Sequence, residues 1–163
     1  MLGELTAYIG LGSNLDGPIE HVQRALRELD ELTQTRLVIA SNLYRSDPMG
    51  PVGQPDYINA VAAVQTRLDA EALLSELQCL EAQHKRVRRE HWGPRTLDLD
   101  LLLYGNDTIH TQRLVVPHSG LAERNFVLIP LFEIAPDLIL PDNRPLAELV
   151  KHCSQAGLKR LVG

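Results

Sequence analysis

The chain has 163 residues, of which 44% are hydrophobic and 23% are charged, and its formal net charge is −5 at pH 7. This length suits a sizeable core, so we expect residues 1–163 to form a single domain. The negative charge gives no general case for binding nucleic acid or a membrane surface, and no apolar stretch reaches the roughly 18 residues of a membrane span. Two distant cysteines, Cys79 and Cys153, suit free thiols in a reducing cytosol, and the N-terminal residues lack the basic region of a signal peptide. We therefore expect a cytoplasmic protein.

The first third of the chain is predicted to contain a strand, a helix and a second strand. The apolar residues 7–11 predict a strand that ends in a turn at residues 12–14. Asp16 is a plausible helix cap and Pro18 suits the first turn of a helix, whose apolar side chains then recur at helical spacing. Residues 37–44 predict the second strand.

The middle of the chain is predicted to add two strands and a second long helix. Residues 46–55 are rich in Pro and Gly and indicate a loop, and residues 57–65 indicate a strand. Asp69 is expected to cap a helix that ends near His84. Residues 97–103 are apolar at most positions and predict the next strand.

The predicted order is therefore strand, helix, strand, strand, helix, strand. This is the pattern of an α+β fold with a ferredoxin-like βαββαβ core, in which two helices pack on one face of an antiparallel sheet. Residues 109–116 suggest a short hairpin after the last of these strands. The C-terminal third is interrupted by several prolines, and we expect an elaboration that packs on the same core.

Two carboxylates, Asp98 and Asp100, interrupt the last apolar strand of that core. Residues i and i+2 of a strand share a face and lie about 6.5–7 Å apart, so both side chains should point the same way. The opposite face is expected to carry Leu97, Leu99, Leu101 and Leu103, whereas Leu102 and Tyr104 continue the aspartate face. The pair is either a solvated polar patch or a set of oxygen ligands for Mg²⁺. We favour the second, because the neighbouring apolar residues indicate partial burial, and with a polyphosphate such a pair could hold two ions about 3.5–4 Å apart.

A basic segment, residues 85–95, leads directly into the aspartate strand. It holds five cationic side chains. Such a run is most often a solvated surface, but next to two carboxylates it suits polyphosphate binding, because arginine grips phosphate oxygens with a planar fork. Trp92 within it would either stack on a base or anchor the segment.

Weaker signals lie elsewhere in the chain. Tyr57 and Asn59 share a strand face that could hold a flat heteroaromatic ring, although by themselves they favour ordinary sheet packing. Residues 10–14 lack the lysine of a phosphate-binding loop, so a tight turn is the favoured interpretation. His118 lies in a second polar and aromatic cluster with Arg124 and Phe126, and the histidines show no zinc-binding spacing.

Segments from nearly the whole chain form one recognisable set. They are Gly12-Ser13-Asn14, Tyr44-Arg45-Ser46, residues 54–60, Arg86-Val87-Arg88, residues 92–100, Val116-Pro117-His118 and Arg124-Asn125-Phe126. Together they resemble the 6-hydroxymethyl-7,8-dihydropterin pyrophosphokinases of folate biosynthesis, and the block Arg95-Thr96-Leu97-Asp98-Leu99-Asp100 is highly specific to that family. The resemblance implies a ferredoxin-like core and transfer of the pyrophosphoryl group of ATP to the pterin hydroxymethyl group, with release of AMP.

The resemblance also implies roles for individual residues. Asp98 and Asp100 would ligate two Mg²⁺ ions, and the catalytic side chains would be Arg86, Arg95, Asp98 and Asp100. The pterin would contact Ser46, Asp47, Met49, Tyr57, Asn59 and Phe126. ATP would contact Gln78, Glu81, Arg88, Trp92, Arg95, Arg113, His118 and Arg124.

Two departures and two rival functions qualify this picture. His91 receives no role, because the spacing around it varies in the family, and Ser119 stands where an aromatic residue or proline can occur. The chain has no room for a second folate enzyme, so we expect a single function. We also expect a monomer that binds only small molecules. A nucleotidyltransferase with the same aspartate pair would release pyrophosphate in place of AMP, and a ligand-binding regulatory module would show no turnover.

Overall fold

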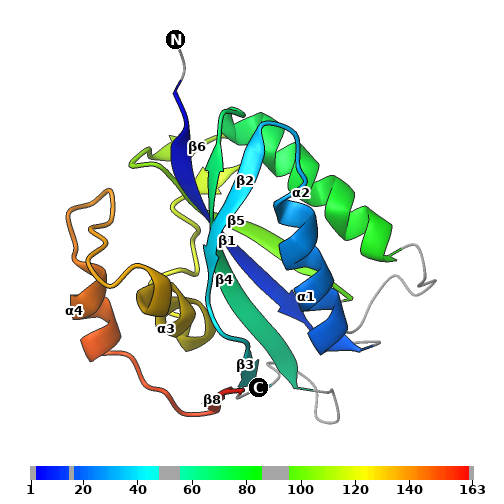
Figure 1. Ribbon diagram of the computed structural model, residues 1–163. Coiled ribbons are helices and arrows are strands. Elements are labelled where there is room, and N and C mark those ends of the chain that lie inside the picture. The colour runs from blue at the N-terminus through cyan, green and yellow to red at the C-terminus, as the bar shows by residue number, and fades with distance from the viewer. Residues whose placement is uncertain (1–2, 15–16, 48–55, 86–95, 162–163) are drawn as a thin grey trace.

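A six-stranded antiparallel sheet forms the centre of the computed structural model, which describes residues 3–14, 17–47, 56–85 and 96–161 (Figure 1). Its strands are β1 (Leu5–Ser13), β2 (Thr35–Ala40), β3 (Tyr44–Ser46), β4 (Tyr57–Thr66), β5 (Asp98–Tyr104) and β8 (Leu158–Arg160). They lie in the order β5-β1-β4-β3-β8, and β2 also pairs with β4. The predicted hairpin is confirmed as β6 (Ile109–His110) and β7 (Val115–Val116).

Helices cover both faces of this sheet. On one face lie α1 (Pro18–Leu29) and α2 (Ala70–Lys85), and on the other lie α3 (Asn125–Ile134) and the short α4 (Leu146–Lys151) (Figure 1). The face under α1 and α2 buries a core that includes Ile9 and Leu73, and the face under α3 buries a second core that includes Leu102 and Leu128. The predicted α+β class is therefore confirmed. The expectation that the C-terminal elaboration packs on the same core was wrong, because α3 and α4 build the second core on the face that the first two helices leave open. None of the helices in the described ranges is long and apolar enough to span a membrane.

The helix starts agree with the sequence. Pro18 begins α1 as predicted, and Gly17, in a left-handed conformation with φ 75°, occupies the cap position. Asp16, the expected cap, lies outside the described residues. Asp69 caps α2 as predicted, because its Oδ1 accepts the backbone N–H of Ala72 at 2.7 Å. The second helix ends at Lys85, one residue beyond the expected end.

Two strand predictions near the site were wrong. A turn was expected at residues 12–14, but β1 continues through Ser13 and pairs with β4 on one side and β5 on the other. The single strand expected at residues 37–44 is two strands. Between them, the Ser41 hydroxyl accepts the N–H of Val61 at 3.0 Å, in place of a backbone carbonyl of the ladder. Asn42 then donates from both its backbone and its side chain to Glu133 of α3, at 2.9 Å each, which draws the chain away from the sheet.

A β-bulge changes the faces of β5. The pairing with β1 slips between Tyr8 opposite Leu103 and Ile9 opposite Leu101, so Leu102 is an extra residue. Leu102 and Leu103 consequently both pack into the core under α3, and Tyr104 returns to the other core. The predicted alternation is correct from Leu97 to Leu102 but wrong for Leu103 and Tyr104.

Strand β8 was not predicted from the sequence. This strand of three residues pairs antiparallel with β3, so that Leu158 lies opposite Ser46 and Arg160 opposite Tyr44. It is short and mostly polar, and it has no alternating pattern from which a strand could be predicted.

Candidate active site

The candidate site is a cavity of about 190 Å³ above the middle strands of the sheet, on the α3 side. Because β1 lies between β4 and β5, Gly12 is opposite both Asn59 and Asp98, and Gly10 is opposite Asp100. A glycine in a strand interior allows close approach by a ligand, because it places no side chain on the sheet. The two glycines thus form the floor of the cavity, with an amide on one side and two carboxylates on the other. Its lining comprises Gly10, Leu11, Gly12, Ser46, Asp47, Tyr57, Asn59, Ala60, Asp98, Asp100, Arg124, Phe126 and Val127.

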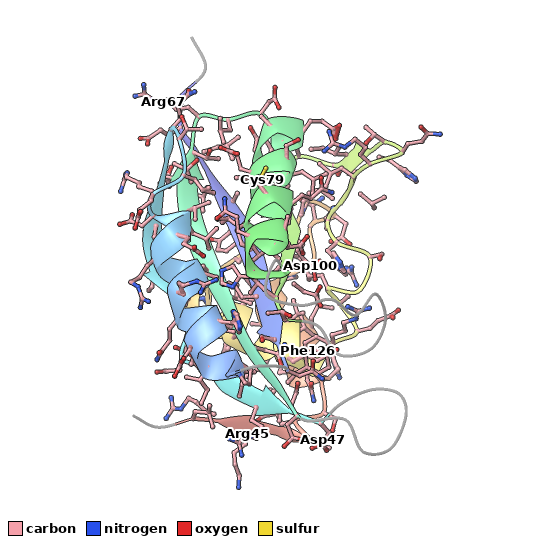
Figure 2. The ribbon with its side chains drawn as sticks, turned by 90° about the vertical axis from the view of Figure 1, so that its right-hand side faces the viewer. Arg45, Asp47, Arg67, Cys79, Asp100 and Phe126 are labelled. Atoms are coloured by element: carbon pink, nitrogen blue, oxygen red, sulfur yellow. The ribbon has the colours of Figure 1, made fainter. Side chains whose placement is uncertain are left out.

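Three parts of the cavity wall can be followed in Figure 2. Asp100 of β5, Phe126 of α3 and Asp47 after β3 succeed one another along one side of the molecule, whereas Arg67 lies at the opposite end. The wall therefore draws on segments from the first, middle and last thirds of the chain.

The two aspartates face the cavity but are not fully buried. Both are of intermediate exposure, and the Asp100 side chain is 47% exposed. Leu99 between them is buried in the opposite core, and its backbone N–H donates to Glu81 Oε2 of α2 at 2.8 Å. Because β5 is the last strand of the sheet at this end, the Glu81 carboxylate satisfies part of its free edge and fixes the strand between the two aspartates. Contact between Glu81 and ATP stays a prediction.

His118 approaches the aspartates from the segment after β7. Its backbone N–H donates to the carbonyl of Leu102 at 3.0 Å, and its Nδ1 accepts the N–H of Gly120 at 3.0 Å. The neutral ring therefore carries its proton on Nε2, since Nδ1 acts as the acceptor. This Nε2 lies 3.9 Å from Asp100 Oδ2, so His118 presents a donor beside the carboxylate pair.

At the other end of the cavity, polar side chains are buried and bonded to one another. The Ser46 hydroxyl donates to Asn59 Oδ1 at 2.6 Å, and both residues are 5% exposed. Asn59 Nδ2 lies over the glycine floor, where a Cβ built on Gly12 would approach it to 3.2 Å. The amide thus has its oxygen satisfied by Ser46 and its two N–H groups at the cavity floor.

Aromatic side chains complete that end. Tyr57 of β4 and Phe126 of α3 both line the cavity, as expected for residues that would enclose a flat ring. The Arg124 guanidinium lies over the Phe126 ring, 5.8 Å from its centroid, within the range of a cation–π contact.

In β3, Tyr44 donates its hydroxyl to Glu133 of α3 at 2.6 Å. Burial raises the pKa of Tyr44 well above its ordinary value, and the hydrogen bond to Glu133 raises it further. The phenol therefore stays protonated and keeps β3 bonded to α3.

Two predicted ATP contacts meet outside the cavity. Arg113 Nη2 donates to Gln78 Oε1 at 3.3 Å and to Ser75 Oγ at 3.0 Å, and Arg113 pairs with Glu71 at 3.4 Å. All of these contacts are exposed on the surface of α2. Gln78 and Arg113 are therefore brought together, as a role with one ligand requires.

Several predicted site residues lie outside the described ranges. They are Met49, Arg86, Arg88, Trp92 and Arg95. Thr96 directly follows Arg95. It is 3% exposed, and its carbonyl accepts a hydrogen bond from the Ser13 hydroxyl at 2.5 Å. The chain that continues from the basic segment is thus fixed to the end of β1, beside the glycine floor.

Gly10 and Gly12 were not predicted as site residues. Their signal in the sequence was available, because two glycines at spacing i, i+2 inside an apolar run share one strand face and leave it bare. Because residues 10–14 were interpreted as a tight turn, the two glycines were not recognised as part of a strand face.

The donor set at the aspartates fits magnesium. Among the described residues no group of three or more His, Cys, Asp or Glu side chains could hold a metal ion by itself. Mg²⁺ is usually bound by one or two carboxylates, waters and substrate phosphates, so the two partly exposed carboxylates of Asp98 and Asp100 suit an ion that arrives with a polyphosphate.

Comparisons with known proteins point in one direction. Residues 8–136 match the family model of 7,8-dihydro-6-hydroxymethylpterin-pyrophosphokinase (HPPK). The 2-amino-4-hydroxy-6-hydroxymethyldihydropteridine pyrophosphokinase of Haemophilus influenzae is 52% identical over 147 residues, which cover 90% of this chain and 92% of that protein. The enzyme of the same name from Pseudomonas aeruginosa is 51% identical over 156 residues, 96% of each chain.

Solved structures share the fold at low identity. The crystal structure of an HPPK–DHPS in complex with substrates superposes with a TM-score of 0.78 at 13% identity. The match covers 99% of this chain and 47% of that one, so the chain spans about half the length of this structural relative. A Plasmodium falciparum HPPK–DHPS triple mutant with pteroate gives a TM-score of 0.75 at 14% identity, over 96% of this chain and 46% of that one.

Proposed function

The chain belongs to the 7,8-dihydro-6-hydroxymethylpterin-pyrophosphokinase family, and we propose that the cavity over Gly10 and Gly12 is its active site. As a member of this family it is a transferase of folate biosynthesis, which moves the pyrophosphoryl group of ATP to the hydroxymethyl group of 6-hydroxymethyl-7,8-dihydropterin. The observation that carries the site assignment is the row of Asn59, Gly12 and Asp98 across three adjacent strands. It brings a ring-binding amide and a carboxylate to opposite sides of a bare floor.

The pterin is assigned to one end of the cavity. This pterin end consists of Ser46, Asp47, Tyr57, Asn59 and Phe126. The aromatic side chains would enclose the ring, and the Asn59 amide would donate to a ring acceptor, since its oxygen is already bonded to Ser46. Met49, which the family motif adds to this set, lies outside the described residues.

The triphosphate is assigned to the other end. This phosphate end consists of Asp98, Asp100 and His118, with Gln78, Glu81, Arg113 and Arg124 as further ATP contacts. Arg86, Arg88, Trp92 and Arg95 are carried over from the family motif as catalytic or ATP-binding side chains. Asp98 and Asp100 would hold Mg²⁺, and two ions suit two carboxylates and a polyphosphate. When bound, the metal neutralises charge on the phosphate oxygens.

The reaction itself is a direct displacement. The pterin hydroxymethyl oxygen attacks the β-phosphorus of ATP, the bond from that phosphorus to the α,β-bridging oxygen breaks, AMP leaves and the hydroxyl proton is released. The residues of the chain act by position and electrostatics, the usual logic of phosphoryl transfer. Ser46 and Asn59 orient the acceptor, and the donor on His118 Nε2 lies where phosphate charge is expected.

The remaining expectations belong to the same proposal. Residues 1–163 would form one pyrophosphokinase domain that acts as a monomer in the cytoplasm on small molecules only. Two free cysteines and the absence of a helix able to span the membrane within the described ranges are compatible with this setting.

Product analysis tests the proposed function. The protein is incubated with ATP, Mg²⁺ and 6-hydroxymethyl-7,8-dihydropterin, and the nucleotide products are separated. We expect AMP and the pterin diphosphate in equal amounts. Release of inorganic pyrophosphate would indicate a nucleotidyltransferase, and ligand binding without turnover would indicate a regulatory module.

A further inference from the structure

The C-terminal segment, residues 154–161, runs directly behind the pterin end. In Figure 1 it continues from α4 to β8, which lies beside β3. Within it, Leu158 is opposite Ser46, and the carbonyl of Gly157 accepts the backbone N–H of Asp47 at 3.1 Å. Two of the residues that line the cavity, Ser46 and Asp47, are therefore held from outside by this segment.

Gly157 allows the segment to come unusually close to Asp47. Its φ of 75° lies in the left-handed region, and a Cβ built on it would lie 2.7 Å from Asp47 Oδ2. No side chain fits there without displacing the Asp47 carboxylate. The position therefore depends on glycine for both its backbone conformation and its space.

The other end of the same segment is held by Asn125. Its Nδ2 donates to the carbonyls of Ser154 and Ala156, at 3.0 Å each, so both amide hydrogens are used on one short stretch of backbone. Asn125 is the first residue of α3 and directly precedes Phe126. Residues 154–157 thus connect the start of α3 to the residue after β3.

We propose that Asn125 is a positioning residue for the pterin, acting through this segment. Phe126 and Asp47 line the same cavity from different elements, and the bridge from Asn125 to Gly157 fixes their separation. The inference rests on the proposed function and deepens it, because it identifies what sets the width of the pterin end. Asn125 is not among the residues that line the cavity, and its amide is bonded to Ser154 and Ala156. It therefore acts on the ligand only through its neighbours.

The expected effect is selective for one substrate. Loss of two hydrogen bonds to the segment allows the pterin end to widen, and we expect the KM for the pterin to rise about fivefold. The segment ends in β8, at the opposite end of the sheet order from β5, which carries Asp98 and Asp100. We therefore expect the KM for ATP and the kcat to stay within about twofold of the wild type.

The experiment compares Asn125→Ala, Asn125→Asp and Gly157→Ala with the wild-type enzyme. Asn125→Asp keeps the size of the side chain but removes both donors. Gly157→Ala disturbs the other end of the bridge. Asp30→Ala is the matched control, because it removes a side-chain bond to the backbone N–H of Leu37, 2.8 Å long, at the far end of the sheet. Each protein is measured with the pterin varied at saturating ATP, with ATP varied at saturating pterin, and by thermal unfolding.

A rise of the pterin KM alone in the three test variants, without a rise in the control, supports the inference. An unchanged pterin KM, a parallel rise of both KM values, or a fall in kcat alone overturns it. If all three test variants are unfolded at the assay temperature, the segment is a folding element and the inference is likewise wrong. Absence of AMP formation by the wild-type enzyme would instead refute the proposed function, so the two failures are distinguished.

Discussion

The two ends of the cavity satisfy their polar groups in opposite ways. At the pterin end, Ser46 and Asn59 are almost fully buried and bonded to each other at 2.6 Å. At the phosphate end, Asp100 keeps a side chain that is 47% exposed, and the nearest His118 nitrogen lies 3.9 Å from its carboxylate. At the pterin end the Asn59 oxygen is bonded within the protein, whereas at the phosphate end nearly half of the Asp100 side chain faces solvent.

The physical chemistry of the two substrates explains this difference. A neutral ring is recognised best by fixed donors and acceptors in a site whose side chains lose little freedom on binding. Carboxylates that receive a metal polyphosphate gain from staying hydrated beforehand, since burying two unpaired charges would be costly. The pterin end is thus preorganised by the protein, and the phosphate end is completed by its ligands. Four predictions test this contrast.

The largest effect is expected for Asp98→Asn at the phosphate end. The change removes one of two carboxylates on the cavity face, so turnover with Mg²⁺ should fall by about 10³-fold or more. Binding of the pterin, measured by calorimetry, should stay within about twofold of the wild type, because Asp98 lies across the glycine floor from Asn59. Near-normal turnover of this variant would contradict the assignment of the metal site.

A smaller effect is expected for Ser46→Ala at the pterin end. The substitution leaves the buried Asn59 oxygen without its donor, which costs about 1–3 kcal/mol. We expect the dissociation constant of the pterin to rise about tenfold or more and the unfolding temperature to fall, while the KM for ATP is unchanged. The matched control is Thr35→Ala. It removes a hydroxyl that lies away from the cavity and is bonded to the Thr66 hydroxyl at 2.8 Å. Equal loss of pterin binding in both variants would show that the effect is general destabilisation.

Sequence alone was sufficient for features that depend on local periodicity. The spacing of Asp98 and Asp100 places both on one strand face, and the structure bears this out for β5 as far as Leu102. Asp69 could be identified as a helix cap because a cap bonds within its own first turn. These features need no knowledge of distant partners.

The errors all involve partners that are distant in the chain. The bulge at Leu102 exists only in the pairing of β5 with β1, and the break after Ala40 depends on Ser41 bonding to β4 and on Glu133 from α3. The glycine floor has meaning only once β1 is known to lie between β4 and β5. Local pattern was therefore enough to place Asp98 and Asp100 on one strand face, whereas the shape of the cavity required the tertiary structure.

The glycine floor offers a finer test of the contrast. A Cβ at Gly12 would lie 3.2 Å from Asn59 Nδ2, whereas a Cβ at Gly10 would lie 3.4 Å from Cδ2 of Leu102, the end of a flexible side chain. We expect Gly12→Ala to raise the KM for the pterin about fivefold, because the fixed amide must shift, and Gly10→Ala to have less effect on it. Steady-state kinetics on the pair would decide the point. If Gly10→Ala weakened pterin binding more, the ring would not lie over Gly12.

The smallest effect is expected for Arg113→Ala on the surface of α2. The ion pair of Arg113 with Glu71 is exposed and 3.4 Å long, so its loss should leave the unfolding temperature nearly unchanged. If Arg113 contacts ATP as proposed, the KM for ATP should rise about threefold, with the pterin KM constant. Arg36→Ala is the control, because its pair with Glu4 is similarly exposed and 3.7 Å long but lies on β2. An ATP KM that is unchanged in both variants would remove Arg113 from the phosphate end and leave its bonds to Ser75 and Gln78 as surface structure.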